Sequence, residues 1–187
     1  MKLKFKNLWM LFSLLLAVSI VTSCDDDDPE MVNEEEVITT VNVTFTNQAD
    51  QSVITASFRD IDGPGGNDPV ISDPSAFAAD ATYSVSIEFL NESDPSDVED
   101  ITEEVGEEDD EHQVFYVAST ALNFTYTYGD QDGDGNPLGL MGSAATGAAS
   151  TGTLNIVLRH EPTKPNDGLA DAGGETDISV TFDVTIQ

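Results

Sequence analysis

Alternation of apolar and polar residues is the feature that most limits how this chain can fold. Near the C-terminus, apolar residues occupy every second position from Ile178 to Ile186, and polar residues, beginning with Asp177, occupy the positions between them. The side chains of a β-strand point alternately to its two sides, so this pattern predicts a strand with one buried face and one face in solvent. Asp177 is therefore expected on the solvent-exposed face.

Six other segments carry a similar signal, because they are rich in valine, isoleucine, threonine and aromatic residues and are separated by turn-forming residues. They are residues 41–46, 53–58, 83–89, 113–117, 122–128 and 154–158. Seven strands within about 150 residues predict a single all-β domain, residues 37–187, folded as an immunoglobulin-like antiparallel β-sandwich. A jelly roll or a small barrel is the alternative.

One short helix is predicted between two of these strands. Ser93, Asp94 and Pro95 offer an N-terminal cap, apolar residues at positions 98, 101 and 105 share one face, and Gly106 offers a stop. Residues 143–152, which are nearly all small, predict a loop or a weak strand.

The N-terminus has the pattern of a secretory signal. Three lysines at positions 2, 4 and 6 precede a mostly apolar run over residues 8–21, which is shorter than the roughly 20 residues of a membrane span. Residues 21–24, Val-Thr-Ser-Cys, resemble the bacterial lipobox, which implies that the signal peptide, residues 1–23, is removed and that Cys24 is acylated as the membrane anchor. An ordinary signal peptide with an incidental cysteine is the alternative. Because Cys24 is the only cysteine, disulfides and thiolate metal sites are excluded.

Acidic residues dominate the charge of the chain. It has 36 aspartates and glutamates against six lysines and arginines, a formal net charge of −30. A field of this sign repels nucleic acids and attracts cations, although a solvated acidic surface is the simpler interpretation. Residues 24–36 contain two of the acidic clusters and are predicted to be a flexible tether between anchor and domain.

The acidic run directly after Cys24 carries a second resemblance. Ser23 and Cys24 followed by four aspartates at positions 25–28 resemble the surface-export signal of lipoproteins in Bacteroidota, which implies a location on the extracellular face of the outer membrane. Residues 33–40 are similar to small flavobacterial lipoproteins that carry the label "type 1 periplasmic binding fold". That label implies alternating strands and long helices, which the strand pattern does not support. The resemblance also implies an accessory role beside a TonB-dependent outer-membrane transporter.

One acidic segment has the spacing of a calcium loop. Asp130, Asp132, Asp134 and Asn136 lie two residues apart, and glycines occupy positions 133 and 135 between them, as in the first half of an EF-hand loop. The twelfth position is Met141, where an EF-hand needs a bidentate glutamate. The segment therefore predicts at most a weak Ca²⁺ site, and a polar hairpin turn is the equal alternative.

The two histidines form a second candidate site. His112 opens one predicted strand and His160 closes another, so the two side chains meet if these strands pair in antiparallel fashion. With Glu111 or Glu161 they offer nitrogen and oxygen ligands that suit Zn²⁺ or Cu²⁺. Two surface histidines at strand ends are the simpler alternative.

The motifs of common enzyme classes are absent from the sequence, including HExxH, the P-loop and the strand-associated GxGxxG. We therefore expect a non-catalytic binding module that captures a cation or a metal complex. The alternative is a structural or adhesive β-sandwich that contacts a protein or a glycan and uses Ca²⁺ only to stabilise its loops. Neither the ligand nor the oligomeric state follows from the sequence.

Overall fold

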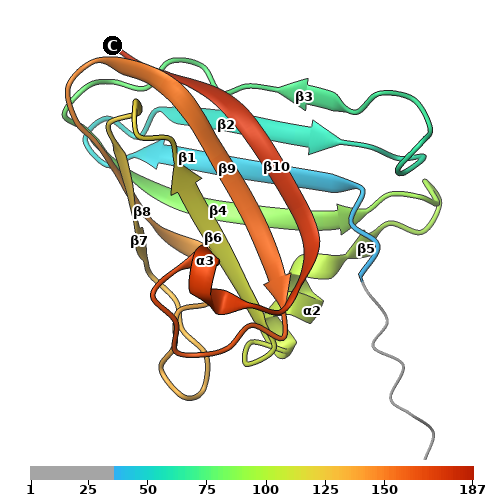
Figure 1. Ribbon diagram of the computed structural model, residues 1–187. Coiled ribbons are helices and arrows are strands. Elements are labelled where there is room, and N and C mark those ends of the chain that lie inside the picture. The colour runs from blue at the N-terminus through green and yellow to red at the C-terminus, as the bar shows by residue number, and fades with distance from the viewer. Residues whose placement is uncertain (1–35) are drawn as a thin grey trace, which may run out of the picture. The chain divides into compact units, whose positions relative to one another are not determined.

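The computed structural model describes residues 36–187 (Figure 1). The predicted signal peptide, the acylation site at Cys24 and the tether as far as residue 35 lie outside the described residues. Within residues 36–187, no helix is both long enough and apolar enough to cross a membrane.

Within the part of the chain that the structure describes, ten strands form two antiparallel sheets. The larger sheet contains β1 (Thr40–Asn47), β2 (Val53–Arg59), β3 (Val70–Ser72), β4 (Thr82–Asn91), β5 (Glu99–Asp100), β7 (Phe124–Tyr128) and β8 (Met141–Thr146). The smaller sheet contains β6 (His112–Ala118), β9 (Ser150–His160) and β10 (Glu175–Ile186). The strand orders are β3-β2-β1-β4-β8-β7, with β5 beside β4, and β10-β9-β6.

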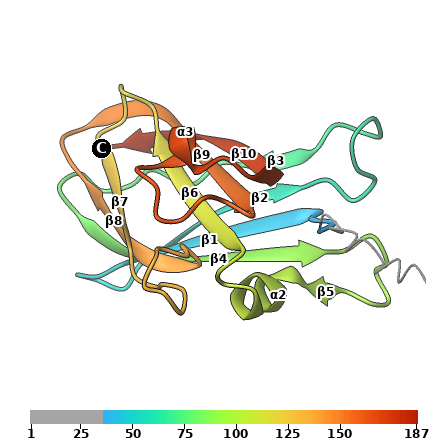
Figure 2. The ribbon, with the colours of Figure 1, turned by 60° about the horizontal axis from the view of Figure 1, so that its bottom comes forward.

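The two sheets lie face to face, with β6, β9 and β10 crossing over β1, β2 and β4 (Figures 1 and 2). This arrangement confirms the predicted antiparallel β-sandwich. Both sheets are open among the residues that the structure describes, so the small-barrel alternative is excluded. All seven predicted strands are present, and β3, β5 and β8 are additional.

One continuous core fills the space between the sheets, and alternation determines its members. Val43 and Phe45 of β1 and Phe182 of β10 are all at most 1% exposed. Phe45 packs edge-to-face on Phe77 with ring centroids 5.0 Å apart, and Phe77 packs in the same way on Tyr83 at 5.2 Å. Edge-to-face packing is a favourable geometry for aromatic rings and adds to the free energy of burying them.

The small residues of β8 have a packing reason. A side chain at Gly142 would collide with the hydroxyl group of Tyr126 and with the carbonyl oxygen of Thr127 on the neighbouring strand. Only glycine allows this close approach. Residues 143–152, for which the sequence predicted either a loop or a weak strand, contain the end of β8, as far as Thr146, and the start of β9, from Ser150.

The helix differs from its prediction at the N-terminal end. Helix α2 covers Ile101–Glu107 and is capped by Asp100, whose carboxylate accepts a hydrogen bond from the backbone N–H of Thr102. Asp94 caps a local turn instead, because its carboxylate accepts hydrogen bonds from the backbone and the hydroxyl of Ser96. Val98 is 49% exposed and contributes nothing to the helix. A second helix, α3 (Leu169–Ala172), was not predicted.

Candidate metal centre

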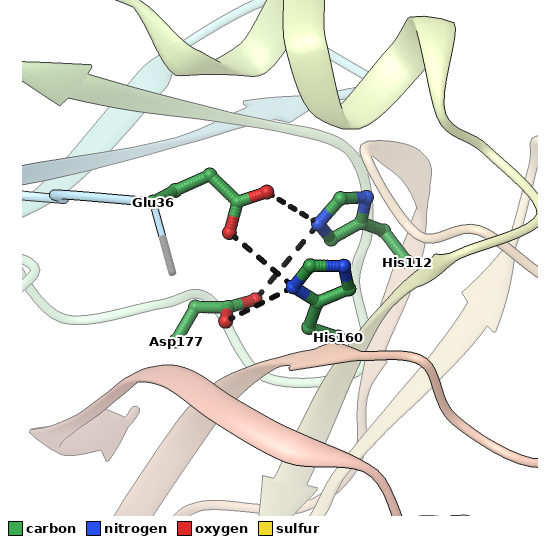
Figure 3. Close-up of side chains that lie close together, drawn as sticks. All are labelled: Glu36, His112, His160 and Asp177. Carbon is green, nitrogen blue, oxygen red and sulfur yellow. Dashed lines mark hydrogen bonds and ion pairs between the residues drawn. The ribbon is translucent and has the colours of Figure 1, made fainter. Parts of the chain in front are cut away.

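Four titratable side chains meet where one end of the small sheet approaches the start of β1 (Figure 3). They are Glu36, His112, His160 and Asp177, and one ligand atom from each lies within 4.8 Å of the others. Glu36 precedes β1, His112 opens β6, His160 closes β9, and Asp177 lies near the start of β10. Every strand of the small sheet thus supplies one residue, and the chain entering the large sheet supplies the fourth.

Strand pairing brings the two histidines together. β6 and β9 are antiparallel neighbours, and His112 and His160 are direct partners in their register. Their imidazole rings lie 4.7 Å apart between centroids, at an interplanar angle of 25°. The strand pairing on which the sequence prediction depended is therefore present, and both histidines are buried rather than on the surface.

Asp177 reaches the site through a β-bulge. The register between β10 and β9 shifts between Thr176 and Ile178, so Asp177 is the extra residue of β10. A bulge interrupts alternation locally and turns a side chain away from its expected direction. The side chain of Asp177 is fully buried, so its predicted place on the solvent-exposed face is wrong.

Glu36 also differs from its predicted place. The sequence assigned it to the acidic tether, but its side chain is only 4% exposed. One carboxylate oxygen, Oε1, lies 2.9 Å from Nε2 of His112, and the other, Oε2, lies 3.8 Å from Nδ1 of His160. The corresponding distances from Asp177 are 4.0 Å to His112 and 3.9 Å to His160. Each carboxylate therefore faces both imidazoles.

The surroundings of the rings determine which nitrogens face the carboxylates. Nδ1 of His112 lies 3.2 Å from the carbonyl oxygen of Glu108, to which it donates, and this leaves Nε2 directed at Glu36. His160 has the opposite orientation, with Nδ1 facing the carboxylates and Nε2 at 3.7 Å from Glu111 Oε2. Metal-binding histidines commonly point their second nitrogen at a carbonyl or a carboxylate in this way.

The burial of this arrangement favours a positive charge at its centre. Two carboxylates are buried beside each other, and neither Glu36 Oε2 nor His160 Nδ1 has a hydrogen-bond partner. Buried polar atoms without such partners are rare, and buried carboxylates are costly unless a cation or a proton compensates them. A neutral His112 that donates to Glu108 also needs a proton or a metal ion between Nε2 and Glu36.

A metal ion fits this set of ligands by distance and by chemistry. Four ligands at about 2.0–2.1 Å around a tetrahedral ion lie roughly 3.3 Å from one another. The four distances between imidazole nitrogens and carboxylate oxygens, from 2.9 to 4.0 Å, lie around that value, and one ligand atom of each residue lies within 4.8 Å of the others. Two imidazole nitrogens with two carboxylates suit Zn²⁺ and Cu²⁺.

Glu111 and Glu161, the carboxylates that the sequence paired with the histidines, lie at the periphery of this centre. They form a separate cluster with His160, and both are exposed. A third cluster joins Glu36 to Glu104 and Glu108 of the α2 region. Burial raises the pKa of Glu104, and the charges of Glu36 and Glu108 raise it further. The centre therefore lies in a region of negative potential.

The calcium-loop candidates are used within their own loop. The buried carboxylate of Asp132 accepts hydrogen bonds from the backbone of Asp134 and from the backbone and side chain of Asn136, and it forms an ion pair with Lys164 at 3.2 Å. Asp130 accepts hydrogen bonds from two backbone N–H groups. Burial raises the pKa of Asp132, but hydrogen bonds from Asn136 and the contact with Lys164 outweigh it and lower the pKa to about 2. This geometry favours the polar-turn alternative.

Sequence reasoning identified His112 and His160 but not the two acidic members of the cluster, Glu36 and Asp177. The position of Glu36, directly before the first apolar strand, is a signal that was available, because strand ends gather at the open ends of a sandwich. For Asp177, alternation pointed the wrong way.

Comparisons of the chain with models of protein families, with curated proteins and with solved structures found no match.

Proposed function

We propose that this protein is a binding module for a divalent transition-metal ion, Zn²⁺ or Cu²⁺. The ligands are Glu36, His112, His160 and Asp177. The proposal depends on one observation, which is the convergence of two imidazoles and two carboxylates in a buried cluster within 4.8 Å. Two atoms of this cluster, Oε2 of Glu36 and Nδ1 of His160, lack hydrogen-bond partners, and a metal ion would bind both.

The number and burial of the ligands favour binding over catalysis. Four protein side chains complete the coordination of a tetrahedral ion, whereas catalytic zinc sites keep one position open for water or substrate. Glu36, His112 and His160 are each at most 5% exposed in their side chains, which leaves little room for a substrate. We therefore propose a non-catalytic role.

The lipobox and the acidic run after Cys24 support a place for this module on the outer membrane, anchored by lipid and facing outward. In that setting it would capture a metal ion or a metal complex as an accessory to a TonB-dependent transporter. A structural role is the second candidate. The ligands come from the small sheet and from the chain entering the large sheet, so a bound ion would join the two sheets and stabilise a sandwich that contacts a protein or a glycan.

Isothermal titration of the full chain with Zn²⁺, Cu²⁺ and Ca²⁺ tests the proposal. We expect one tight site per chain, with tighter binding of Cu²⁺ than of Zn²⁺, following the general order of affinities for nitrogen and oxygen ligands. The variant His112→Ala/His160→Ala should lose both ions and should leave any weak Ca²⁺ binding unchanged. Wild-type protein that binds neither Zn²⁺ nor Cu²⁺ more tightly than about 1 mM would contradict the proposal.

A further inference from the structure

We infer that Glu111, Glu161 and Nε2 of His160 form an outer metal site, through which a divalent transition-metal ion reaches the buried centre. The inference rests on the proposed function, because it concerns the path to the same centre. It assigns a role to the two glutamates that surround His160 on its exposed side.

The outer site is built where two neighbouring strands meet their loops. Glu111 directly precedes β6, and Glu161 directly follows β9. The backbone N–H of Glu161 donates a 2.6 Å hydrogen bond to the carbonyl oxygen of Glu111, so the two residues lie next to each other. Ligand atoms of Glu111, His160 and Glu161 lie within 4.8 Å of one another, which places two exposed carboxylates and one imidazole nitrogen around a single point.

His160 connects the outer site to the inner one. Its side chain is 95% buried, since only 5% is exposed, and its two ring nitrogens face different clusters. Nδ1 points at Glu36 and Asp177 and has no hydrogen-bond partner, whereas Nε2 points at Glu111 from 3.7 Å. An ion on Nε2 therefore needs to move only from one side of this ring to the other to reach the centre.

The transfer is balanced without any other reactant. A neutral imidazole has one N–H and one lone pair. While the ion is bound to Nε2, the ring proton is on Nδ1. When the ion binds Nδ1, the ring loses the proton on Nδ1 and gains one on Nε2, which faces the carboxylate of Glu111, so the ring stays neutral and no net proton is released or consumed. The ion exchanges one nitrogen ligand and two carboxylates for another set, and its charge does not change.

A second approach to the centre serves as a control. Glu104 and Glu108 cluster with Glu36, and both are exposed. This cluster carries as many exposed carboxylates as the outer site, but it has no nitrogen ligand, so it offers a borderline-soft ion less favourable ligands. Replacing either pair by glutamine removes two negative charges close to the centre. General attraction of cations by the negative field is therefore reduced by a similar amount in both variants.

Stopped-flow measurement of Zn²⁺ association and dissociation, on the full chain, tests the inference. We expect Glu111→Gln/Glu161→Gln to slow association by about 10-fold or more and to slow dissociation to a similar degree, so that the Kd changes little. Glu104→Gln/Glu108→Gln should keep the association rate of the wild type within about two-fold, because the nitrogen-containing site is intact.

Three outcomes overturn the inference. Faster dissociation with unchanged association in the Glu111→Gln/Glu161→Gln variant means that Glu111 only supports the His160 ring from outside. Equal slowing in both variants means that the general field, not a defined site, guides the ion. Unchanged rates in both variants mean that the ion arrives by another path. A wild-type protein that binds no Zn²⁺ at all contradicts the proposed function itself, and this result is distinct from the other three.

Discussion

Replacing Glu36 by glutamine removes one proposed metal ligand while leaving the rest of the candidate centre in place. Glutamine has nearly the same volume, and its amide N–H can donate a hydrogen bond to the lone pair on Nε2 of neutral His112, which lies 2.9 Å from the Glu36 carboxylate. We therefore expect the metal-free variant to melt within a few degrees of the metal-free wild type. The difference should emerge only when Zn²⁺ is added.

The size of that difference follows from binding linkage. At a Zn²⁺ concentration 100 times the Kd, binding stabilises the wild type by about 2.7 kcal/mol. Residues that only support a metal ligand typically contribute 10–100-fold to affinity, so loss of a direct ligand should weaken binding by at least about 100-fold. At the same Zn²⁺ concentration, the variant then gains only about 0.4 kcal/mol. With roughly 2–4 °C per kcal/mol for a domain of this size, the zinc-induced shift in Tm falls from about 5–11 °C to about 1–2 °C.

Differential scanning calorimetry with and without Zn²⁺ measures both shifts. Glu88→Gln is the matched control, since Glu88 is exposed on β4, belongs to none of the clusters of possible metal ligands within residues 36–187, and accepts a hydrogen bond from the side chain of Asn42. It should show the full zinc-induced shift of the wild type. A Glu36→Gln variant that also keeps the full shift would refute the assignment of Glu36 as a ligand. If the metal-free variant melts far below the wild type, Glu36 acts mainly in folding.

Three further predictions concern other parts of the chain. Asp132→Asn should lower the free energy of unfolding by up to about 2 kcal/mol at pH 7. This loss should shrink as the pH falls from about 4 towards 2, because the carboxylate of Asp132, whose pKa is lowered, stabilises the fold only while it is charged. Urea unfolding at both ends of that pH range measures the change. Gly174→Ala should destabilise the fold by more than about 1 kcal/mol, since residue 174 has φ +67° and its new side chain would collide with a carbonyl oxygen of β9. Gly168→Ala should destabilise the fold less, because residue 168 has φ +128° but open space around it. Equal losses of stability in chemical denaturation would contradict the predicted collision. Cys24→Ser should move the protein from the detergent phase to the aqueous phase in Triton X-114 partition, and unchanged partition would count against the lipid anchor. Replacing the aspartates at positions 25–28 by asparagine should protect the protein from protease added to whole cells, and unchanged digestion would count against the export signal.

Much of the sandwich followed from alternation, because each strand of a two-layer fold buries one side. Val41, Val43 and Phe45 are buried at every second position of β1, as the pattern requires. Alternation does not predict edge strands such as β3, because all three residues of that strand are exposed and no buried face marks it. It also left β8 undecided between a loop and a weak strand, because the residues there are small, and at Gly142 this small size makes room for the ring of Tyr126 on the neighbouring strand. That contact depends on the strand order, which a single sequence does not contain.

The helix start was misplaced because two segments compete for the same signals. Both Asp94 and Asp100 can cap a helix, and Pro95 favours the first. The structure uses Asp100, because Ile101 and Val105 are then buried, at 5% and 0% exposure, while the residues before them remain in a turn. Packing of the apolar face, rather than the proline, determined where the helix begins.

The metal centre was half predictable for a related reason. His112 and His160 lie at strand ends that antiparallel pairing can bring together, so the sequence suggested their meeting. Asp177 depends on a bulge, and a bulge changes the direction of a side chain without a clear mark in the sequence. Glu36 was not identified, because it is the last residue of an acidic run and nothing in the sequence distinguishes it from the other glutamates of that run, although its side chain is buried.

The scattered origin of the four ligands has a consequence for when the ion can bind. Glu36 and His112 are 76 positions apart, and His160 and Asp177 follow only after further strands. An unfolded chain would have to close several long loops around one ion, which opposes chelation by segments of an incomplete chain. Tight binding would therefore begin only after the small sheet has docked on the large one. Metal occupancy would then report that the last stage of folding is complete, and the metal content of a purified sample would measure the fraction of fully folded protein.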